Sequence, residues 1–477
     1  MDAAMIHHIN ELLENAKQAA AIFSQFNQEQ TDRIVRAVYQ AGMNHRVRLA
    51  KMAVEETGMG RWEDKVLKNV VATQYVYEDI KDQKTVGVIS DDEVSGITEI
   101  AQPAGPILAV VPVTNPTSTT LFKVLIALKT RNPIIISPHP RATKCSTEAA
   151  RICYEAALKE DAPEYCVQWV NDASHEQTQA LMKHRDLALV LATGGGGLVK
   201  EAYSSGNPAL GVGSGNVPVL IEKSADVPFA AAQIFTSKTF DNGTICSSEQ
   251  AIVVEEEIAG QLEESLIKLG SHFLDANEVK TLTEVVYDPE RRTTNAHLLG
   301  KSAAVIGTLA GLDVPPDTQL LIAPLAGIGE EYPLSGEILA PILAYYVARD
   351  FSQALCICMD LNFYGGMGHS ASIYSNDPAK IIEFSQALNA GRILVNTPSS
   401  QGAIGGMYNT LHSSLTLGCG TAGKNITTDN ISANHLLNIQ RIARRRMNQK
   451  MFAMDPTLYL DERLDAEAIE RHHNLTC

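Results

Sequence analysis

The chain has 477 residues, 45% of them hydrophobic and 20% charged, and this length and composition allow more than one buried core. The formal net charge is −16, from 39 Lys and Arg against 55 Asp and Glu, so the field of the whole molecule repels nucleic acids and anionic membranes. We therefore expect an ordinary globular enzyme with no nucleic-acid partner and no membrane partner.

The N-terminus, MDAAMIHHINELLENAKQ, carries acids and lacks an apolar core of signal-peptide length, and no apolar run approaches the roughly 18 residues of a membrane span. The eight cysteines, Cys477 included, form no CxxC pair and no zinc-ligand spacing. These features predict a cytoplasmic protein with reduced thiols and no metal centre.

A helical region opens the chain, because apolar residues recur at helical spacing from Met5 to about Val76. Residues 84–101, KTVGVISDDEVSGITEIA, alternate in polarity and predict two strands around a turn at 91–95. This hairpin has no evident core face of its own, so we interpret it as an oligomer contact.

Short apolar segments, each beside an amphipathic segment of helix length, follow in two sets. The repeated βα unit predicts a parallel, doubly wound sheet, and the second set predicts a second α/β lobe over roughly 230–417. The first set is ILAVV (107–111), PIIIS (133–137), CVQWV (166–170), LALVL (187–191) and VPVLI (217–221), and the second is AIVV from 251, LLIA from 320, ASIY from 371 and RILVN from 392.

The last segment, after residue 447, has Leu460, Leu464 and Ile469 at loosely helical spacing among charges. This pattern predicts a surface helix, and a helix that docks on a partner is the alternative.

Cys246 is the first candidate for chemistry. It lies between a turn signal, Asp241 to Gly243, and an apolar strand that begins near Ala251, so its thiol is placed to face a cleft. A single cysteine is also compatible with an inert core residue, and on the cysteine alone this alternative stays open.

A glycine run, Gly194 to Gly197, follows a predicted strand that ends at Thr193 and leads into a predicted helix. Glycines in such a place let backbone amides approach a phosphate at the helix N-terminus. The spacing is not GxGxxG, and a flexible linker is the alternative, which the flanking strand disfavours.

Two long segments, 100–147 and 384–428, contain no Asp or Glu although the protein is strongly acidic. Buried strands explain part of this, but cations remain in the first segment. We infer a local positive surface that receives nucleotide phosphates, formed by Lys123, Lys129, Arg131, Arg141 and Lys144.

Five long motifs resemble those of the CoA-acylating aldehyde dehydrogenases, a family that includes stand-alone acetaldehyde and succinate-semialdehyde enzymes and the N-terminal half of bifunctional aldehyde-alcohol dehydrogenases. The resemblance runs from about residue 5 to 445. The motifs are KMAVEETGMGRWEDKVLKN (51–69), VTNPTSTTLFKVLIALKTRNPIIISPHPRA (113–142), ATGGGGLVKEAYSSGNPALGVGSGN (192–216), FDNGTICSSEQ (240–250) and LTLGCGTAGKNITTDNISANHLLNI (415–439).

The resemblance implies an α/β, aldehyde dehydrogenase-like fold with two doubly wound parallel-sheet domains and a small β oligomerisation element. It also implies a homodimer or homotetramer. The expected parts are a nucleotide-binding domain (1–83 and 102–229), oligomerisation strands (84–101 and 415–440), a catalytic domain (230–414) and a C-terminal tail (441–477).

On the same resemblance Cys246 is the nucleophile, which forms a thiohemiacetal and then a thioester. The Asn115 amide, with the backbone N–H of Cys246, stabilises the oxyanion, although an Asx-turn before Pro116 is the structural alternative. Glu337 resembles the glutamate that holds the nicotinamide ribose, and a helix-start carboxylate is its alternative. His369 fits the family pattern as a base for the CoA thiol, but a packed or solvated histidine is the simpler interpretation.

The cofactor implied is NAD, with NADP open because the SPHPR segment has no carboxylate to exclude a 2′-phosphate, and coenzyme A is the co-substrate. The other cofactor-binding residues expected from the family motifs are Thr114, Ser137, Pro138, His139, Arg141, Thr193, Gly194, Gly195, Gly196 and Gly213.

Val212 is the departure that decides the reaction type. Hydrolytic relatives have a lysine where Ser137 stands and a glutamate where Val212 stands, and that glutamate activates the water that cleaves the thioester. Without this base a thiol is the better nucleophile, because thiolates attack near neutral pH whereas water needs a base. The expected reaction is the reversible oxidation of a short-chain aldehyde, by default acetaldehyde, to its acyl-CoA.

Several alternatives stay open at this point. One is an anionic aldehyde such as succinate semialdehyde or sulfoacetaldehyde, another is a hydrolytic dehydrogenase that releases a free acid, and a third is a scaffold protein without activity. The tail also does not resemble the linker into an iron-dependent alcohol dehydrogenase, so we expect the chain to act without a second enzymatic half.

Overall fold

The computed structural model describes residues 3–290, 293–449, 452 and 455–475. The chain divides into two compact units, the first formed by Met1–Gln83 and Pro103–Leu437 and the second by Lys84–Gln102 and Asn438–Cys477. Cys477 lies outside the described residues. Across those residues, none of the helices combines the length and the apolar character needed to cross a bilayer.

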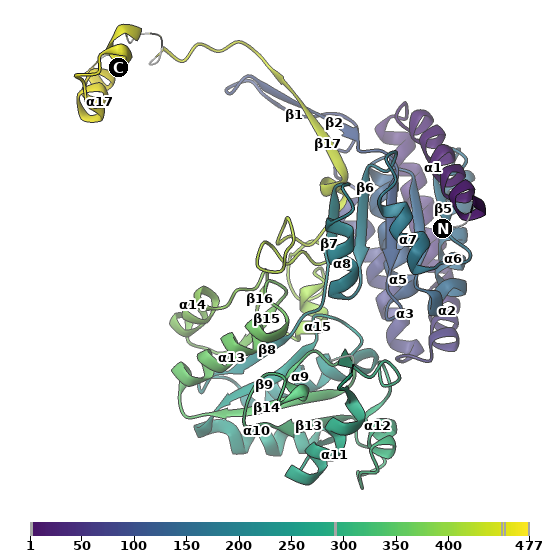
Figure 1. Cartoon of the computed structure of the whole chain (residues 1–477), viewed down its shortest axis with the longest axis vertical. Helices are drawn as coiled ribbons and strands as arrows, with labels where there is room; N and C mark the ends of the chain where they lie inside the picture. The colour runs from purple at the N-terminus through teal and green to yellow at the C-terminus, as the bar shows by residue number, and fades with distance from the viewer. Residues whose placement is uncertain (1–2, 291–292, 450–451, 453–454, 476–477) are drawn as a thin grey trace. The chain divides into compact units, whose positions relative to one another are not determined.

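The first unit contains a parallel sheet of five strands in the order β5-β4-β3-β6-β7, with helices on both faces (Figure 1). Its strands are buried on both sides because helices cover both faces, which explains why they are apolar throughout. The strands are β3 (Ile107–Val111), β4 (Ile134–Pro138), β5 (Val167–Trp169), β6 (Leu189–Thr193) and β7 (Ala209–Val212).

Two apolar clusters hold this sheet between its helices. One packs the side chains of Ile107, Ala109 and Val111 against the second, fifth and sixth helices, and the other packs Leu108 and Val110 against the first, seventh and eighth. The helices are α1 (Ala3–Phe23), α2 (Gln28–Thr57), α3 (Trp62–Val70), α4 (Val76–Ile80), α5 (Pro116–Lys129), α6 (Thr143–Leu158), α7 (His175–Met182) and α8 (Gly196–Tyr203).

The strand order places a topological switch at β3. The chain proceeds from β3 to β4 and β5 on one side, and then returns to β6 and β7 on the other. In open α/β sheets the carboxyl edge at such a switch is where ligands bind, because the loops that leave β3 and β6 diverge there. The loops in question are 112–115 and 194–195.

A second parallel sheet in the same unit has seven strands in the order β10-β13-β14-β9-β8-β15-β16. β8 pairs with β9, with Val219 opposite Ile252, so the strand at 217–221 belongs to this sheet and not to the first set in which the sequence pattern placed it. The strands are β8 (Val217–Ile221), β9 (Glu249–Glu255), β10 (Ser271–Phe273), β13 (Leu320–Pro324), β14 (Ile342–Ala348), β15 (Ala371–Tyr374) and β16 (Ile393–Val395).

Helices cover the second sheet as well. α9 and α10 pack on the face that carries Val219 and Ile252, and α13 and α14 pack on the opposite face. The helices are α9 (Val227–Thr239), α10 (Glu256–Lys268), α11 (Ala276–Val286), α12 (Ala303–Leu309), α13 (Phe351–Gly365), α14 (Pro378–Ala387) and α15 (Ser399–Ala403), and a two-stranded ribbon joins β11 (Tyr287–Asp288) to β12 (Thr293–Thr294).

The second unit is a three-stranded sheet in the order β1-β2-β17 with a helical tail. The hairpin expected at 84–101 is present, as β1 (Gly87–Asp92) and β2 (Ile97–Pro103) pair antiparallel. β17 (Leu437–Ala443) adds the third strand, and α17 (Ala466–Leu475) is a helix in the tail. Of the three residues whose spacing predicted a helix there, only Ile469 lies in α17, while Leu460 ends a 3₁₀ turn (Pro456–Leu460) and Leu464 precedes the helix. Residues 415–436 belong to the first unit, so of the 415–440 segment only residues 437–440 lie in the strand β17.

Candidate active site

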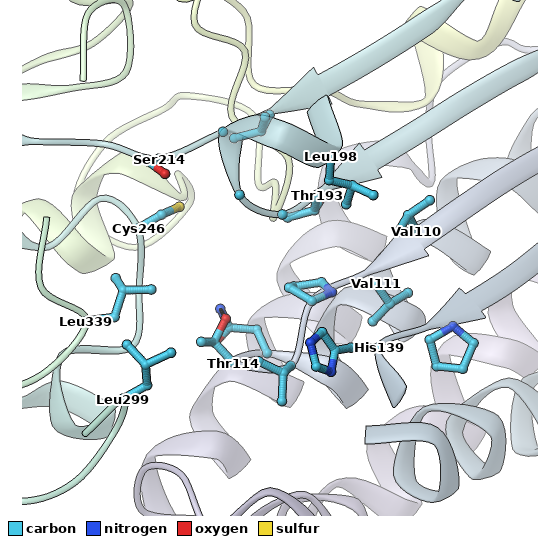
Figure 2. Close-up of a pocket in the computed structure, with 18 of the residues that line it drawn as sticks. Val110, Val111, Thr114, His139, Thr193, Leu198, Ser214, Cys246, Leu299 and Leu339 are labelled. Atoms are coloured by element: carbon cyan, nitrogen blue, oxygen red, sulfur yellow. Dashed lines mark hydrogen bonds between the residues drawn. The ribbon is translucent and has the colours of Figure 1, made fainter. Parts of the chain in front are cut away.

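A cavity of about 560 Å³ lies at the carboxyl edge of the first sheet and faces the second sheet (Figure 2). The loops after β3, β4 and β6 form one side of it, as the switch in strand order predicts. The other side is formed by the segment before β9 and by the residues around Glu337. The cavity therefore joins the glycine loop to the thiol of Cys246.

Cys246 lines this cavity from the segment between α9 and β9. It is partly buried, and burial together with the nearby carboxylate of Glu337 raises the pKa of its thiol to about 12. The guanidinium of Arg392 acts in the opposite direction but is the weaker influence. The thiol is thus mostly protonated at neutral pH, and its surroundings oppose formation of the thiolate.

Asn115 lines the same cavity at the start of α5, where Pro116 occupies the first turn. It makes no side-chain cap for this helix, so the Asx-turn alternative does not account for its amide. Its Nδ2 donates to Thr114 Oγ1 at 3.2 Å and to the carbonyl of Thr244 at 3.3 Å, two residues before Cys246. Both contacts lie at the long end of the hydrogen-bond range, so they are weak ones.

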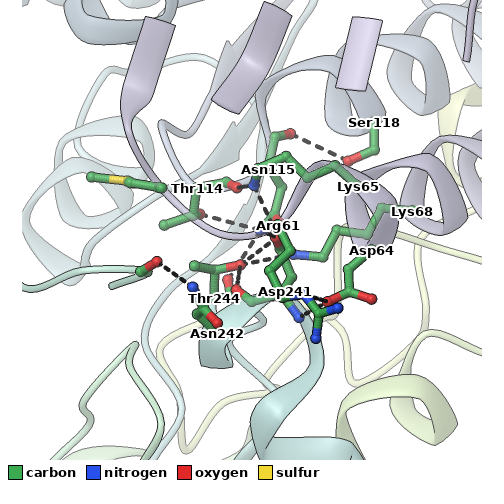
Figure 3. A network of polar contacts seen from close by, with 12 residues as sticks. Arg61, Asp64, Lys65, Lys68, Thr114, Asn115, Ser118, Asp241, Asn242 and Thr244 are labelled. Atoms are coloured by element: carbon green, nitrogen blue, oxygen red, sulfur yellow. Dashed lines mark hydrogen bonds and ion pairs between the residues drawn. The ribbon is translucent and has the colours of Figure 1, made fainter. Parts of the chain in front are cut away.

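Behind Asn115 lies a buried group of charges (Figure 3). Lys68 Nζ donates to Asn115 Oδ1 at 2.6 Å, to Thr244 Oγ1 at 2.8 Å and to the carboxylate of Asp241. Lys65 Nζ donates to Asp241 Oδ2 at 2.9 Å and to the carbonyl of Thr114 at 2.9 Å. The two lysines stand three residues apart on α3, which places them on one face of the helix.

The protonation states of this group follow from its burial. Burial by itself would raise the pKa of Asp241, but the charges of Lys68 and Lys65 outweigh it and hold that pKa below its ordinary value. Burial lowers the pKa of Lys68 to about 8, and Asp241 limits the decrease. At neutral pH Asp241 is therefore an anion and Lys68 a cation, and Asp241 also pairs with Lys65.

Glu337 follows a short 3₁₀ turn and not a helix, so the helix-start alternative is wrong. Its Oε1 accepts from the backbone N–H of Gly215 at 3.0 Å, and burial raises the pKa of its carboxyl. Val212, buried at the end of β7, also lines the cavity. Among the described residues that line the cavity, Glu337 is the only carboxylate.

The glycine loop lies where the sequence pattern placed it. Thr193, Gly194 and Gly195 line the cavity, and so do Thr114 and Gly213. Gly195 is the N-cap of α8 and provides no side-chain cap, which leaves the first turn of this helix open to an anion. Gly196 opens the helix itself and does not line the cavity.

Only some residues of the SPHPR segment (137–141) line the cavity. Pro138 and His139 line the cavity, and the His139 ring accepts from the backbone N–H of Arg141 at 3.1 Å. Ser137 is buried and shares a hydrogen bond of 2.8 Å with Thr178, which itself lines the cavity. The Arg141 side chain is exposed and is not part of the lining.

His369 is fully buried and does not line the cavity. Its Nδ1 shares a hydrogen bond of 3.0 Å with Ser370 Oγ, and burial, helped by Arg392, lowers the pKa of the ring to about 3. A Cβ added at Gly215 would lie 2.8 Å from its Cγ, so the ring packs directly beneath the backbone that neighbours Cys246. This geometry matches the packed-histidine interpretation and gives the ring no contact with a thiol in the cavity.

The prediction of a positive surface from segment 100–147 is wrong for three of its five cations, because their side chains are buried. Lys123 is fully buried and donates to the carbonyls of Val110 at 2.7 Å and Leu191 at 2.8 Å, which joins β3 to β6. Lys129 and Arg131 are also buried, and they bond to Asp32 and to the carbonyl of Ser24. These cations satisfy internal acceptors and are not available to phosphates.

Sequence patterns missed the charged residues behind the cavity and part of its lining. Lys68 and Asp241, which lie behind Asn115, were not assigned a role in the site, because a lysine on a short helix and an aspartate in a turn are usually solvated. The apolar lining between the two sheets was also missed, since it comes from unrelated segments. Its members include Leu198, Leu299 and Leu339 (Figure 2). His175 and Thr178 from α7 also line the cavity and were not predicted. Among the described residues, no group of three or more His, Cys, Asp or Glu is placed to hold a metal ion.

The sequence matches the aldehyde dehydrogenase family over residues 1–410. It is 44% identical over 463 residues to the bifunctional aldehyde-alcohol dehydrogenase of Escherichia coli, covering 96% of this chain and 52% of that protein. The chain thus spans about half the length of the bifunctional relatives that it matches.

This chain aligns with almost the whole length of its stand-alone relatives. The succinate-semialdehyde dehydrogenase (acetylating) of Clostridium kluyveri is 36% identical over 435 residues, which cover 91% of this chain and 95% of that protein. The crystal structure of an acetylating aldehyde dehydrogenase from Geobacillus thermoglucosidasius superposes with a TM-score of 0.91 at 45% identity, covering 93% of this chain and 98% of that one.

One solved structure is informative about ligands. A propionaldehyde dehydrogenase from Rhodopseudomonas palustris, crystallised with bound CoA and an acylated cysteine, has a TM-score of 0.82 at 27% identity and covers 91% of this chain and 97% of that one. Fold, site geometry and relatives agree. The chain belongs to the aldehyde dehydrogenase family and, within it, to the CoA-acylating aldehyde dehydrogenases.

Proposed function

We propose that this chain oxidises a short-chain aldehyde to its acyl-CoA, reversibly, with NAD(P) as oxidant and Cys246 as the group that carries the acyl fragment. The observation that carries the proposal is the lining of the cavity, where the thiol of Cys246, the amide of Asn115 and the open first turn of α8 meet. Relatives named as acylating dehydrogenases, and one with an acylated cysteine, support it.

The Cys246 sulfur would attack the aldehyde carbon and form a thiohemiacetal. The oxyanion that develops needs donors that are already in place, and the Asn115 Nδ2 and the backbone N–H of Cys246 supply them. Proton loss from the Cys246 thiol is the step that burial opposes, because the neutral form is favoured there.

The residues of the cavity fit a pyridine dinucleotide. The uncapped first turn of α8 would hold the pyrophosphate, Glu337 would hold the hydroxyls of the nicotinamide ribose, and Pro138 and His139 would lie at the adenosine end. A bound dinucleotide would supply the oxidation by accepting a hydride, which leaves a thioester on Cys246. The lining shows no carboxylate near His139, so both NAD and NADP remain compatible.

Release of the acyl group is the step that separates the acylating reaction from the hydrolytic alternative. A base for water is missing at Val212, and Glu337 is already bonded to the Gly215 amide. Water therefore lacks activation. A CoA thiolate is already a strong nucleophile, so it attacks the thioester carbon without help from a base. This difference favours thiol attack over hydrolysis.

An uncharged aldehyde suits the cavity better than an anionic one, because no Lys or Arg occurs among the described lining residues and Leu299 and Leu339 are apolar. The seven described cysteines are all free, which supports a reducing compartment, and we infer the cytoplasm. The proposed partners are small molecules and further copies of this chain.

The test is a product analysis. Purified protein is incubated with acetaldehyde, propionaldehyde or succinate semialdehyde, with NAD or NADP, and with or without CoA. Acyl-CoA is identified by mass and reduced nucleotide by absorbance. We expect acyl-CoA and reduced nucleotide in equal amounts, dependence on CoA, and a loss of at least about 10³-fold in Cys246→Ala. Free acid formed at the same rate without CoA would refute the acylating reaction.

A further inference from the structure

Lys68 lies outside the cavity, but it touches the amide that the cavity uses. Its Nζ donates to Asn115 Oδ1 at 2.6 Å, and its two remaining hydrogens go to Thr244 Oγ1 at 2.8 Å and to Asp241 (Figure 3). We infer that Lys68 is a positioning residue, which fixes and polarises the Asn115 amide for the oxyanion formed on Cys246. The inference rests on the function proposed above.

The orientation of the amide follows from hydrogen-bond chemistry. An ammonium group has donors only, so the atom of Asn115 that faces Lys68 must be the carbonyl oxygen. The NH₂ group is thereby turned away from Lys68 and toward the Thr244 carbonyl, two residues from Cys246. Without this ammonium, an amide rotated by half a turn would present its oxygen to the oxyanion and repel it.

The ammonium also strengthens the donor. A charged donor on Oδ1 draws electron density through the amide and leaves the N–H groups more positive. Lys68 is fully buried, so water does not screen this effect. Lys65 and Lys68 together carry one more charge than the Asp241 carboxylate between them, and the neighbouring Asp64 is paired with Arg61, so a net positive charge lies behind Asn115 and favours an anion on the cavity side.

The surrounding backbone is shaped to keep this arrangement. Asp241 and Asn242 both adopt left-handed conformations, with φ of 49° and 52°, which cost non-glycine residues energy. Gly60 approaches so closely that an added Cβ would lie 1.9 Å from Asp241 Oδ1. Local strain of this kind persists where the surroundings fix a group in place, and the group fixed here is the carboxylate that holds Lys68.

A reaction that needs neither nucleotide nor CoA isolates this effect. p-Nitrophenyl acetate can acetylate Cys246. The thiol gives up its proton to solvent, its sulfur forms a bond to the acetyl carbon through the same kind of oxyanion, and the bond to the phenolic oxygen breaks so that nitrophenolate leaves. The rate is followed by nitrophenolate absorbance, and the acetyl group on Cys246 is located by mass spectrometry. Wild type, Lys68→Met, Asn115→Ala and the double variant form a mutant cycle.

We expect Lys68→Met to lower the maximal acetylation rate about 10- to 100-fold, somewhat less than the loss from removing an oxyanion donor altogether, with little change in the ester concentration at half-maximal rate. In the Asn115→Ala background the same substitution should cost less than about 3-fold, because its target is gone. Lys129→Met is the matched control. It also removes a fully buried ammonium, at the far end of α5, and should leave the rate unchanged.

If Lys68→Met lowered the rate by the same factor with and without Asn115, the inference would be overturned. An equal loss of rate in Lys129→Met would overturn it too. If Lys68→Met does not fold, Lys68→Gln replaces it, since this variant removes the charge and keeps a polar side chain. A wild-type protein that is not acetylated at Cys246 would overturn the proposed function together with the inference. A wild type that is acetylated, with additive variants, would overturn the inference alone.

Discussion

At the scale of single residues, the resting state of Cys246 is the most direct consequence of the structure. Burial and the Glu337 carboxylate both favour the neutral thiol, so its pKa is raised to about 12. The thiolate fraction then grows across the whole accessible pH range. The rate of alkylation by iodoacetamide should accordingly rise about tenfold per pH unit from pH 7 to pH 10, without a plateau.

A substitution separates the two causes. Glu337→Gln removes the negative charge but not the burial, so the pKa of Cys246 should fall and alkylation at pH 8 should accelerate. Mass spectrometry of the modified peptide confirms that Cys246 is the residue labelled, and Cys246→Ala gives the background rate. A wild-type plateau below pH 9 would contradict the raised pKa.

The sequence motifs identified the residues that carry out the chemistry. They did not identify the residues that position those side chains. Cys246, Asn115 and Glu337 stand in long family motifs, and the structure brings them to one cavity. Lys68 occurs in a motif as well, but nothing in a short amphipathic helix indicates that its ammonium is buried against Asn115. A charge is buried only where the tertiary fold places a suitable partner beside it. Here that partner is Asp241, which comes from a distant segment of the chain.

At the scale of elements, apolar runs located most of the strands and could not assign them to sheets. The run at 107–111 coincides with β3, and that at 217–221 coincides with β8. β8 nevertheless pairs with β9 and β15, because sheet membership is decided by long-range pairing that periodicity does not encode. β7 was not predicted, since its four residues contain a glycine and follow a proline.

The turn between α2 and α3 is the element on which the buried charges depend. Gly58 and Gly60 both have left-handed backbones, with φ of 67° and 74°. An alanine at Gly58 would meet only the flexible end of Lys301, at 3.4 Å, whereas an alanine at Gly60 would collide with the Asp241 carboxylate. Both variants cost backbone strain of about 1 kcal/mol, and Gly60→Ala should cost several kcal/mol more.

Urea denaturation measures this difference, and the acetylation of Cys246 shows its effect on the site. Gly58→Ala should keep the wild-type acetylation rate, while Gly60→Ala should lower it because Asp241 is displaced from Lys68. Equal losses of stability in the two variants would mean that the Asp241 carboxylate moves aside without cost.

At the scale of the whole molecule, the cavity is lined from the first unit. Among the residues that the structure describes, those that line it all belong to this unit, between Val110 and Leu339. The second unit instead presents a small sheet whose outer strands, β1 and β17, carry mostly exposed residues. The outer strand of a sheet has backbone N–H and C=O groups that can pair with a strand of another copy. This property fits the homodimer or homotetramer proposed for this chain.

A charge on β17 should separate assembly from chemistry. Ile442 is 47% exposed on this strand, and Ile442→Asp would place a carboxylate where a second copy is expected to pair. We expect a smaller species by light scattering after size exclusion, with the Cys246 acetylation rate per chain within about 2-fold of wild type, because substitutions remote from a site leave it largely unaffected. Leu460→Asp, on a residue that is 79% exposed in the tail, is the matched control and should retain the assembly. If Leu460→Asp dissociates the protein and Ile442→Asp does not, the tail is the contact, since only docking of the tail on a partner gives that order of effects.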